Sequence, residues 1–157
     1  MVKYHIIHGD TQKHHFTDEV LYFPSSSAEN SRVQLRDDIS RATEWNVTFD
    51  FKNHMAYIRT HREPHLVLHL TGEHNVVKAV KKHGKGWPCA FSMVGDDHFI
   101  LTDVNKVQRM GTSVNVNNLV LTQDVAKYPT ATKNEKWRIE PLYSPYLLQH
   151  FSHYYVE

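Results

Sequence analysis

The chain has very little cysteine and no excess of either charge, and both absences narrow what it can be. Its 157 residues contain one cysteine, Cys89, so no disulfide can form within the chain. The chain has 18 lysine and arginine residues and 17 aspartate and glutamate residues. Its formal net charge is therefore +1, which gives no bias toward nucleic acid or an anionic membrane. We therefore expect no nucleic-acid partner. We also expect a reducing compartment, with the cytoplasm favoured over secretion without disulfides.

Long apolar runs and the common catalytic motifs are absent too. No stretch approaches the roughly 20 apolar residues of a membrane-spanning helix, so no membrane insertion is expected. Residues 1–8 alternate in polarity and lack the apolar core of a signal peptide. The chain has no Gly-x-Ser-x-Gly elbow, no phosphate-binding glycine loop and no His-Glu-x-x-His pair. The sequence therefore predicts a protein that is not an enzyme and carries no cofactor.

Short apolar runs of period two fill most of the chain, with turn residues between them. Gly9-Asp10, Gly84-Lys85-Gly86 and Asn117-Asn118 are examples of these turns. Helical periodicity is scarce. A turn about every ten residues is typical of an all-β sandwich or barrel. The length predicts a single domain over residues 1–157.

Three tryptophans indicate an internal repeat. Trp45, Trp87 and Trp137 each lead a strand-like run, and they lie 42 and 50 residues apart. An alternating apolar segment precedes each one. Recurrence over such a period is the signature of repeat architectures.

Three units of about four strands each, at residues 1–50, 51–97 and 98–157, predict a β-trefoil. This fold is a six-stranded barrel capped by three hairpins. Each unit is expected to place its tryptophan in the shared core, with the indole N–H bonded to a backbone acceptor. Cys89, which follows Pro88 in a predicted core strand, is expected to be a buried small apolar residue.

A family resemblance rests on residues 20–51. The segments that show the resemblance are Val20-Leu21-Tyr22-Phe23-Pro24, the stretch from Asn30 to Ile39, and Phe49-Asp50-Phe51. Together they resemble one repeat of the β-trefoil lectins of mussels, within the wider ricin-B-like group. The resemblance implies a β-trefoil that binds galactose-type sugars without catalysis.

In that family each repeat carries a His-Pro-Tyr-Gly-Gly loop, an Asn-containing turn and an Asp-x-His pair, which hold the sugar. This chain keeps only parts of the pattern. In the first unit an acidic residue remains but Ser40 replaces its histidine, and in the third unit no histidine stands beside the aspartate. The carbohydrate-binding residues that the resemblance implies are Asp38, His69, Gly72, His83, Gln108 and Asp124.

Thirteen histidines raise the question of a metal site. His61, His65 and His69 recur every four residues, which is a helical ligand spacing. However, Pro64 and the apolar run 66–68 favour a strand, along which the three side chains would spread. No fourth ligand for a tetrahedral site is visible, so no metal site is predicted. The histidines also favour pH sensing as a minor alternative.

We therefore predict a glycan-binding protein with glycans or glycoconjugates as partners and with a possible homodimer. One alternative is a β-trefoil protease inhibitor or other protein-binding module, using loop 22–31 or loop 126–136. The second loop carries Lys127, Lys133 and Lys136, and each suits a trypsin-type pocket. The other alternative is a structural or signalling trefoil, although basic residues cluster only over 78–85.

Overall fold

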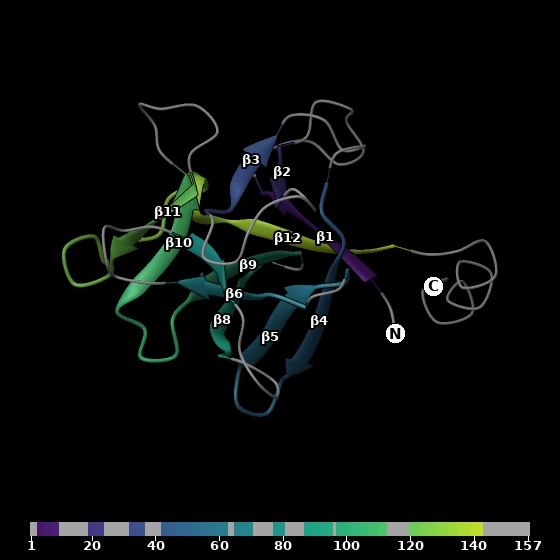
Figure 1. Ribbon diagram of the computed structural model, residues 1–157. Helices are drawn as coiled ribbons and strands as arrows, with labels where there is room; N and C mark the ends of the chain where they lie inside the picture. The colour runs from purple at the N-terminus through teal and green to yellow at the C-terminus, as the bar shows by residue number, and fades with distance from the viewer. Residues whose placement is uncertain are drawn as a thin grey trace.

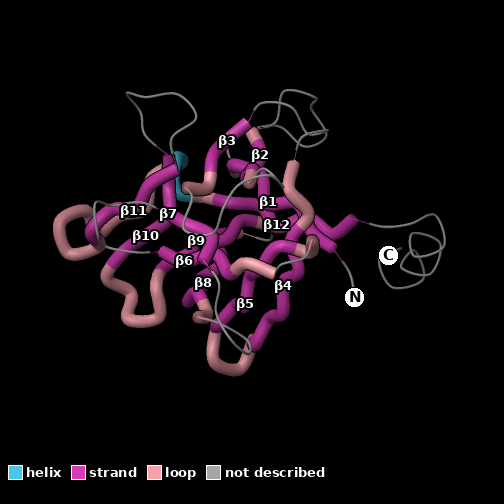
Figure 2. Tube along the Cα trace, viewed as in Figure 1, coloured by secondary structure: helices cyan, strands magenta, loops and turns pink. Residues whose placement is uncertain are grey.

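The computed structural model describes residues 3–9, 19–23, 32–36, 42–62, 65–70, 77–80, 87–95, 97–112 and 120–142. Nearly all of the ordered elements in this part of the chain are strands, with one short 3-10 helix, Lys133–Glu135 (Figure 2). The strands are β1 Lys3–His8, β2 Val20–Tyr22, β3 Gln34–Arg36, β4 Trp45–Asp50, β5 Met55–Thr60, β6 Val67–Leu70, β7 Val77–Val80, β8 Cys89–Val94, β9 His98–Thr102, β10 Gln108–Thr112, β11 Val120–Asp124 and β12 Trp137–Leu142. No helix among the described residues is long and apolar enough to cross a membrane.

Six strands close a barrel. β1 pairs with β4 and β12, and the ring continues from β4 through β5, β8 and β9 back to β12, always antiparallel (Figure 1). The other six strands form the hairpins β2–β3, β6–β7 and β10–β11. Each hairpin pairs with the first strand of its own group of four. The predicted all-β trefoil with three four-stranded repeats is therefore confirmed. The extent of the domain over residues 1–157 stays a prediction.

The three repeats share one core position at the start of their fourth strand. Trp45 pairs with Tyr4, Cys89 with Ala56, and Trp137 with Phe99. In each pair the partner is the second residue of the repeat's first strand. The equivalent positions therefore hold tryptophan, cysteine and tryptophan.

Two of the tryptophans occupy the core as predicted. Trp45 and Trp137 are both 0% exposed. The indole N–H of Trp137 donates to the backbone oxygen of Met110 at 3.1 Å, which confirms the expected backbone acceptor. The buried N–H of Trp45 has no acceptor among the described residues.

The prediction that Trp87 packs in the core is wrong. This residue lies two positions before Cys89, the first residue of β8, and it is 40% exposed. Pro88 has no N–H to donate to a ladder, so the strand begins after it. Cys89 then takes the core position and is 2% exposed, as predicted for a small apolar side chain.

Phenylalanines pack the barrel near the β4–β5 turn. Phe49 stacks on Phe99 with ring centroids 5.5 Å apart, and it meets Phe91 edge-on at 5.7 Å. Tyr4 adds another edge contact to Phe49. Outside this cluster Phe51 stacks on Phe49 but stays 61% exposed at the tip of the turn.

A buried ion pair ties the third repeat together. The Nε of Arg109 in β10 pairs with the carboxylate of Glu135, and both side chains are only 4% exposed. Arg109 also donates from Nη2 to the backbone oxygen of Tyr128 at 2.6 Å. The other oxygen of Glu135 accepts from the backbone N–H and the hydroxyl of Thr132. The segment between β11 and β12 is therefore fastened to β10 at several points.

Candidate functional site

A pocket of about 200 Å³ lies between the second and third repeats. Three separate segments line it. The first is Leu68 to Leu70 in β6, the second runs from Trp87 to Cys89, and the third is the turn from Asp103 to Asn105 after β9. The volume is below the range of about 300–1,000 Å³ that is usual for drug-sized ligands. The pocket therefore suits one small ring that stays partly exposed.

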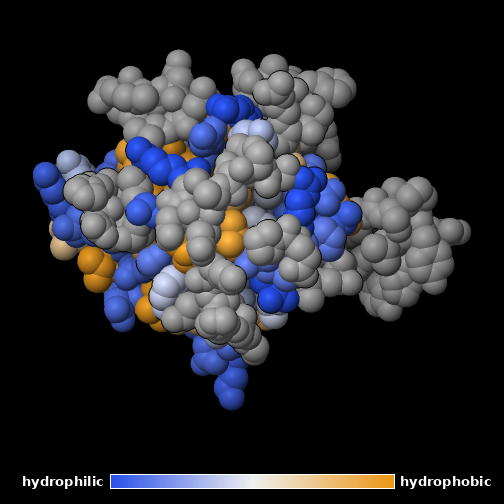
Figure 3. Space-filling view, in the orientation of Figure 1, coloured by the Kyte–Doolittle hydropathy of each residue, from blue (hydrophilic) through white to orange (hydrophobic). Residues whose placement is uncertain are grey.

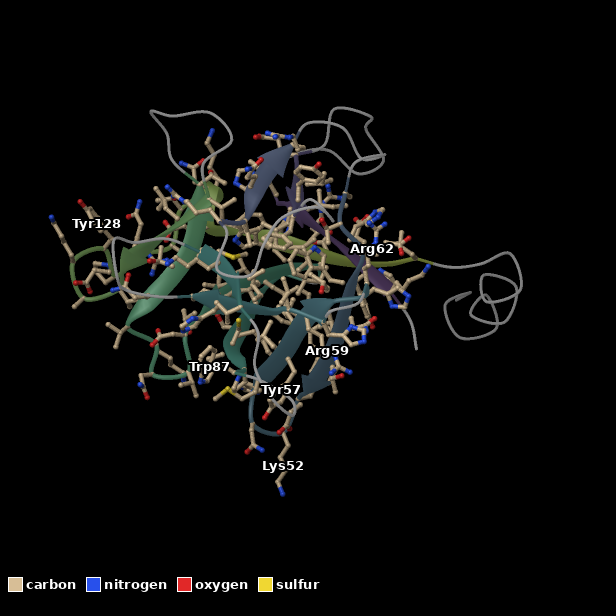
Figure 4. The ribbon with its side chains drawn as sticks, viewed as in Figure 1. Lys52, Tyr57, Arg59, Arg62, Trp87 and Tyr128 are labelled. Atoms are coloured by element: carbon tan, nitrogen blue, oxygen red, sulfur yellow. The ribbon has the colours of Figure 1, made fainter. Side chains whose placement is uncertain are left out.

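An aromatic platform forms one wall of this pocket. The imidazole of His69 stacks on the indole of Trp87, with centroids 4.3 Å apart and planes inclined by 27°. Trp87 stands at the surface, where Figure 4 labels it below β6. A half-exposed indole offers a flat apolar face.

Asp103 and Asn105, in the turn after β9, line the same pocket as the platform. Asp103 accepts hydrogen bonds at Oδ1 from the backbone N–H of Val107 at 2.7 Å and of Gln108 at 2.8 Å. These bonds shape the turn, in which Lys106 adopts a positive φ of 60°. The second oxygen of Asp103, Oδ2, receives no hydrogen bond from a described residue. The pocket thus holds a carboxylate whose position is set by the backbone, with Asn105 two residues further on.

Cys89, which also lines the pocket, has an unreactive thiol at neutral pH. Burial, followed by the negative charge of Asp103, raises the pKa of the Cys89 thiol from 9.0 to about 12. A thiol with such a pKa stays protonated at neutral pH, and the thiolate is the nucleophilic form. Cys89 therefore acts as a packing residue behind the pocket.

The corresponding places in the other two repeats are taken by residues that hold the backbone. The position two residues before the shared core site is Thr43, Trp87 or Glu135 in the three repeats. The hydroxyl of Thr43 accepts from the N–H of Phe23 at 2.6 Å and donates to its carbonyl at 3.0 Å. Glu135 pairs with buried Arg109. Only the second repeat presents an exposed aromatic side chain at this position.

The residues predicted from the family resemblance fall into three groups. His69 lines the pocket. Gln108 and Asp124 lie directly opposite each other in the β10–β11 ladder, and the N–H of Gln108 bonds to pocket residue Asp103. Asp38, Gly72 and His83 lie outside the described residues. As a binding set, the six residues stay a prediction.

Sequence reasoning missed Trp87, Asp103 and Asn105. The signal for Trp87 was Pro88, because a proline excluded from the ladder moves the start of the strand and leaves the preceding tryptophan outside it. The residues Asp103 and Asn105 are turn formers, and nothing in the sequence relates them to a segment 16 residues upstream. Their common pocket depends on barrel closure.

The histidine spacing that raised the metal question does not produce a ligand cluster in the described part of the chain. His61 shares a 2.9 Å hydrogen bond with the Asn46 side chain, and His65 bonds to the carbonyl of Thr60. No group of three or more histidine, cysteine, aspartate or glutamate side chains among the described residues is arranged to hold a metal ion.

Comparison with known proteins gives structural likeness only. No protein-family profile and no curated protein sequence matches this chain. A mosquitocidal holotoxin matches with a TM-score of 0.65 at 13% identity over 90% of this chain, which corresponds to 17% of the holotoxin chain. ThreeFoil, a designed protein of threefold symmetry, matches with a TM-score of 0.65 at 12% identity over 89% of this chain and 99% of its own. A salivary protein from Culex quiquefasciatus, of the Cysteine and Tryptophan-Rich (CWRC) family, matches with a TM-score of 0.60 at 14% identity, over 90% of this chain and 94% of its own.

These likenesses agree with the closed six-stranded ring and the three hairpins. At 12–14% identity these matches show that the fold is shared, and they show nothing about function. The β-trefoil implied by the resemblance to ricin-B-like lectins is therefore confirmed, while membership of a lectin family stays a prediction. The chain is a β-trefoil whose function must be argued from its own pocket.

Proposed function

We propose that this protein is a non-catalytic glycan-binding protein, and that it holds a galactose-type sugar in the pocket between β6 and the turn after β9. The observation that carries the proposal is the exposed Trp87 in a pocket that Asp103 also lines. A sugar needs both features. Its apolar face of C–H groups stacks on an aromatic ring, and its hydroxyls donate to carboxylate and amide oxygens.

The groups in the pocket have complementary roles. Trp87 supplies the stacking surface, and the His69 ring stacked on one of its faces fixes the orientation of the indole. Oδ2 of Asp103 accepts from one or two vicinal hydroxyls, while the backbone bonds to Oδ1 keep the carboxylate in position. Asn105 offers both a donor and an acceptor. Preorganised groups of this kind lose little conformational entropy on binding.

The proposal assigns one sugar site to the described residues. Thr43 and Glu135, which stand where Trp87 stands in the other repeats, are engaged in backbone and ion-pair contacts. Affinity for a single sugar unit is then modest. A homodimer, which stays a prediction, would raise avidity through effective concentration.

Binding of free galactose, lactose and a glycan array by Trp87→Ala and Asp103→Asn variants tests the proposal. Asparagine at position 103 keeps an oxygen for the two backbone bonds but replaces the second carboxylate oxygen with a donor. We expect each variant to lose about tenfold or more in affinity, since tenfold corresponds to about 1.4 kcal/mol. Isothermal titration gives the affinities, and circular dichroism checks that the β signal is retained.

Phe51→Ala is the matched control because Phe51 is another exposed aromatic residue, on the β4–β5 turn. It should leave sugar affinity unchanged. If no glycan binds the parent protein, or if Phe51→Ala weakens binding as much as Trp87→Ala does, the proposal is wrong.

One observation favours the protease-inhibitor alternative. The turn after β11 exposes Lys127 and Tyr128, and buried Arg109 holds its backbone through the carbonyls of Tyr128 and Thr130. An exposed lysine on a fastened loop has the chemistry that a trypsin-type pocket accepts. Lys133 starts the short helix, and Lys136 is half-buried. A trypsin and papain inhibition assay at micromolar protein, repeated with Lys127→Ala, distinguishes this function from sugar binding.

A further inference from the structure

A row of three basic residues runs across the strands next to the pocket. His69 in β6 lies directly opposite Lys78 in β7, and Lys78 forms an isolated antiparallel bridge with Arg32. Residues that face each other in an antiparallel pair project from the same side of the sheet. The three basic side chains therefore leave one face together, and Nη2 of Arg32 also donates to the backbone oxygen of Val120 in β11 at 3.5 Å. Neighbouring strands are about 4.8 Å apart, so the row is about 10 Å long.

The face that carries the row is the outer one. Leu68 and Leu70, on either side of His69, are buried, and so are Val77 and Ala79 on either side of Lys78. His69 and Lys78 are half-buried, and Arg32 is exposed. Among the coloured residues of Figure 3, hydrophilic ones lie beside hydrophobic ones.

His69 belongs both to this row and to the wall of the pocket. A ligand that stacks on Trp87 would therefore reach the basic row with any substituent directed across β6 and β7. Lysine and arginine are cationic at neutral pH, and they bind sulfate and carboxylate groups through charge-assisted hydrogen bonds. The basic segment noted in the sequence continues at 81–85, which lies outside the described residues.

We propose that the Arg32–Lys78–His69 row makes the pocket selective for anionic glycans, meaning galactose-type sugars that carry a sulfate or a carboxylate. This inference rests on the proposed function and specifies its ligand class. The sugar ring occupies the Trp87 pocket and its acidic substituent lies on the row.

The negative charge in the pocket does not oppose this arrangement. Asp103 is the acidic residue that lines the pocket. Its Oδ1 is compensated by the N–H groups of Val107 and Gln108. The carboxylate is on the turn after β9, whereas the row extends from His69 away from the pocket lining onto β7 and Arg32. Hydroxyls and acidic substituents are therefore received on different sides of the ligand.

Binding of lactose, 3′-sialyllactose and 3′-sulfated galactose to the full chain tests this proposal. The row variant combines Arg32→Gln with Lys78→Gln. We expect the parent to prefer the two anionic sugars by about tenfold or more, and the row variant to lose that preference while its affinity for lactose stays within about twofold. Raising the salt from about 50 to about 500 mM should weaken anionic binding to the parent and not to the row variant.

Lys52→Gln with Arg62→Gln is the matched control, because it removes the same two charges from exposed residues elsewhere on the molecule (Figure 4). It should keep the anionic preference. Trp87→Ala should lose both neutral and anionic sugars, and inorganic sulfate alone should bind far more weakly than the sulfated sugar.

The outcomes separate the two proposals. Lactose binding without any anionic preference overturns the selectivity and leaves the proposed function standing. Absence of all glycan binding overturns both. An anionic preference that survives the row variant, or sulfated-sugar binding that survives Trp87→Ala, shows that the anion is held elsewhere and overturns the proposal.

Discussion

The imidazole of His69 lies over the indole of Trp87 with their centroids 4.3 Å apart, and the two residues belong to separate segments of the second repeat. This stack turns a histidine on a strand and a tryptophan ahead of another strand into one wall of a pocket. Trp87 takes this place because Cys89 fills the core position that Trp45 and Trp137 fill in the other repeats.

Because cysteine takes the core position in the second repeat, the tryptophans should contribute unequally to the free energy of unfolding. Trp137→Phe should lower the free energy of unfolding by about 1–3 kcal/mol, because it reduces a fully buried side chain and removes the hydrogen bond to Met110. Trp87→Phe should change it by less than about 1 kcal/mol because the side chain is 40% exposed. Urea unfolding measures both, and equal losses would contradict the assignment of Trp87 to the surface.

Cys89 should make stability depend on pH in the alkaline range. Burial raises its pKa from 9.0 to about 12, so the folded state favours the protonated thiol. Its contribution to stability is fully present below about pH 9 and is lost as the pH rises toward about 12. The free energy of unfolding should therefore fall less steeply between about pH 8 and about pH 10.5 in Cys89→Ala than in the parent.

The parent and Cys89→Ala share all their other ionisable groups, so the difference between their slopes isolates Cys89. The native thiol should also resist iodoacetamide at about pH 8 and react once the chain is unfolded in urea. Rapid alkylation of the folded protein would show that the thiol is not buried as described.

Removing one partner of the buried Arg109–Glu135 pair should strongly destabilise the protein, whereas replacing both residues with apolar ones should destabilise it much less. Glu135→Gln leaves the arginine charge buried, and we expect a loss of about 3–5 kcal/mol in unfolding free energy. The double variant Arg109→Met with Glu135→Leu should recover much of that loss, since no uncompensated charge remains. A double-mutant cycle in urea measures the coupling. Additive effects would mean that the two side chains do not act as a pair.

Two glycines should tolerate alanine to very different degrees. A Cβ at Gly9 would lie 2.5 Å from the backbone oxygen of Lys136 and 2.6 Å from the His98 ring. Gly9→Ala therefore has to displace backbone where β1 meets β12, and we expect a fall of about 3 kcal/mol or more. At Gly95 a Cβ meets nothing within 4 Å, but φ is +67°.

Gly95→Ala should consequently lose only about 1–2 kcal/mol, which is the usual penalty for a left-handed residue with a side chain. Thermal unfolding of the two variants side by side tests the comparison. A larger loss at Gly95 than at Gly9 would contradict the close approach of Gly9 to Lys136.

The repeat and the strands could be predicted because they depend on local pattern. Period-two alternation and regular turns indicate strands, and the recurrence of Trp45 and Trp137 marks the start of equivalent strands. The same pattern misplaced Trp87, because similar spacing along the chain does not guarantee the same register. Pro88 shifts the start of β8 by two residues.

By itself, the sequence determined the all-β class, the threefold repeat and the burial of Cys89, since these follow from the period of apolar residues and from side-chain size. Only the tertiary structure decided where chemistry can occur. Barrel closure brings the turn at Asp103 against Trp87, and antiparallel pairing places Lys78 between His69 and Arg32. Such contacts join residues from different strands, and no periodicity within a single strand encodes which of them meet.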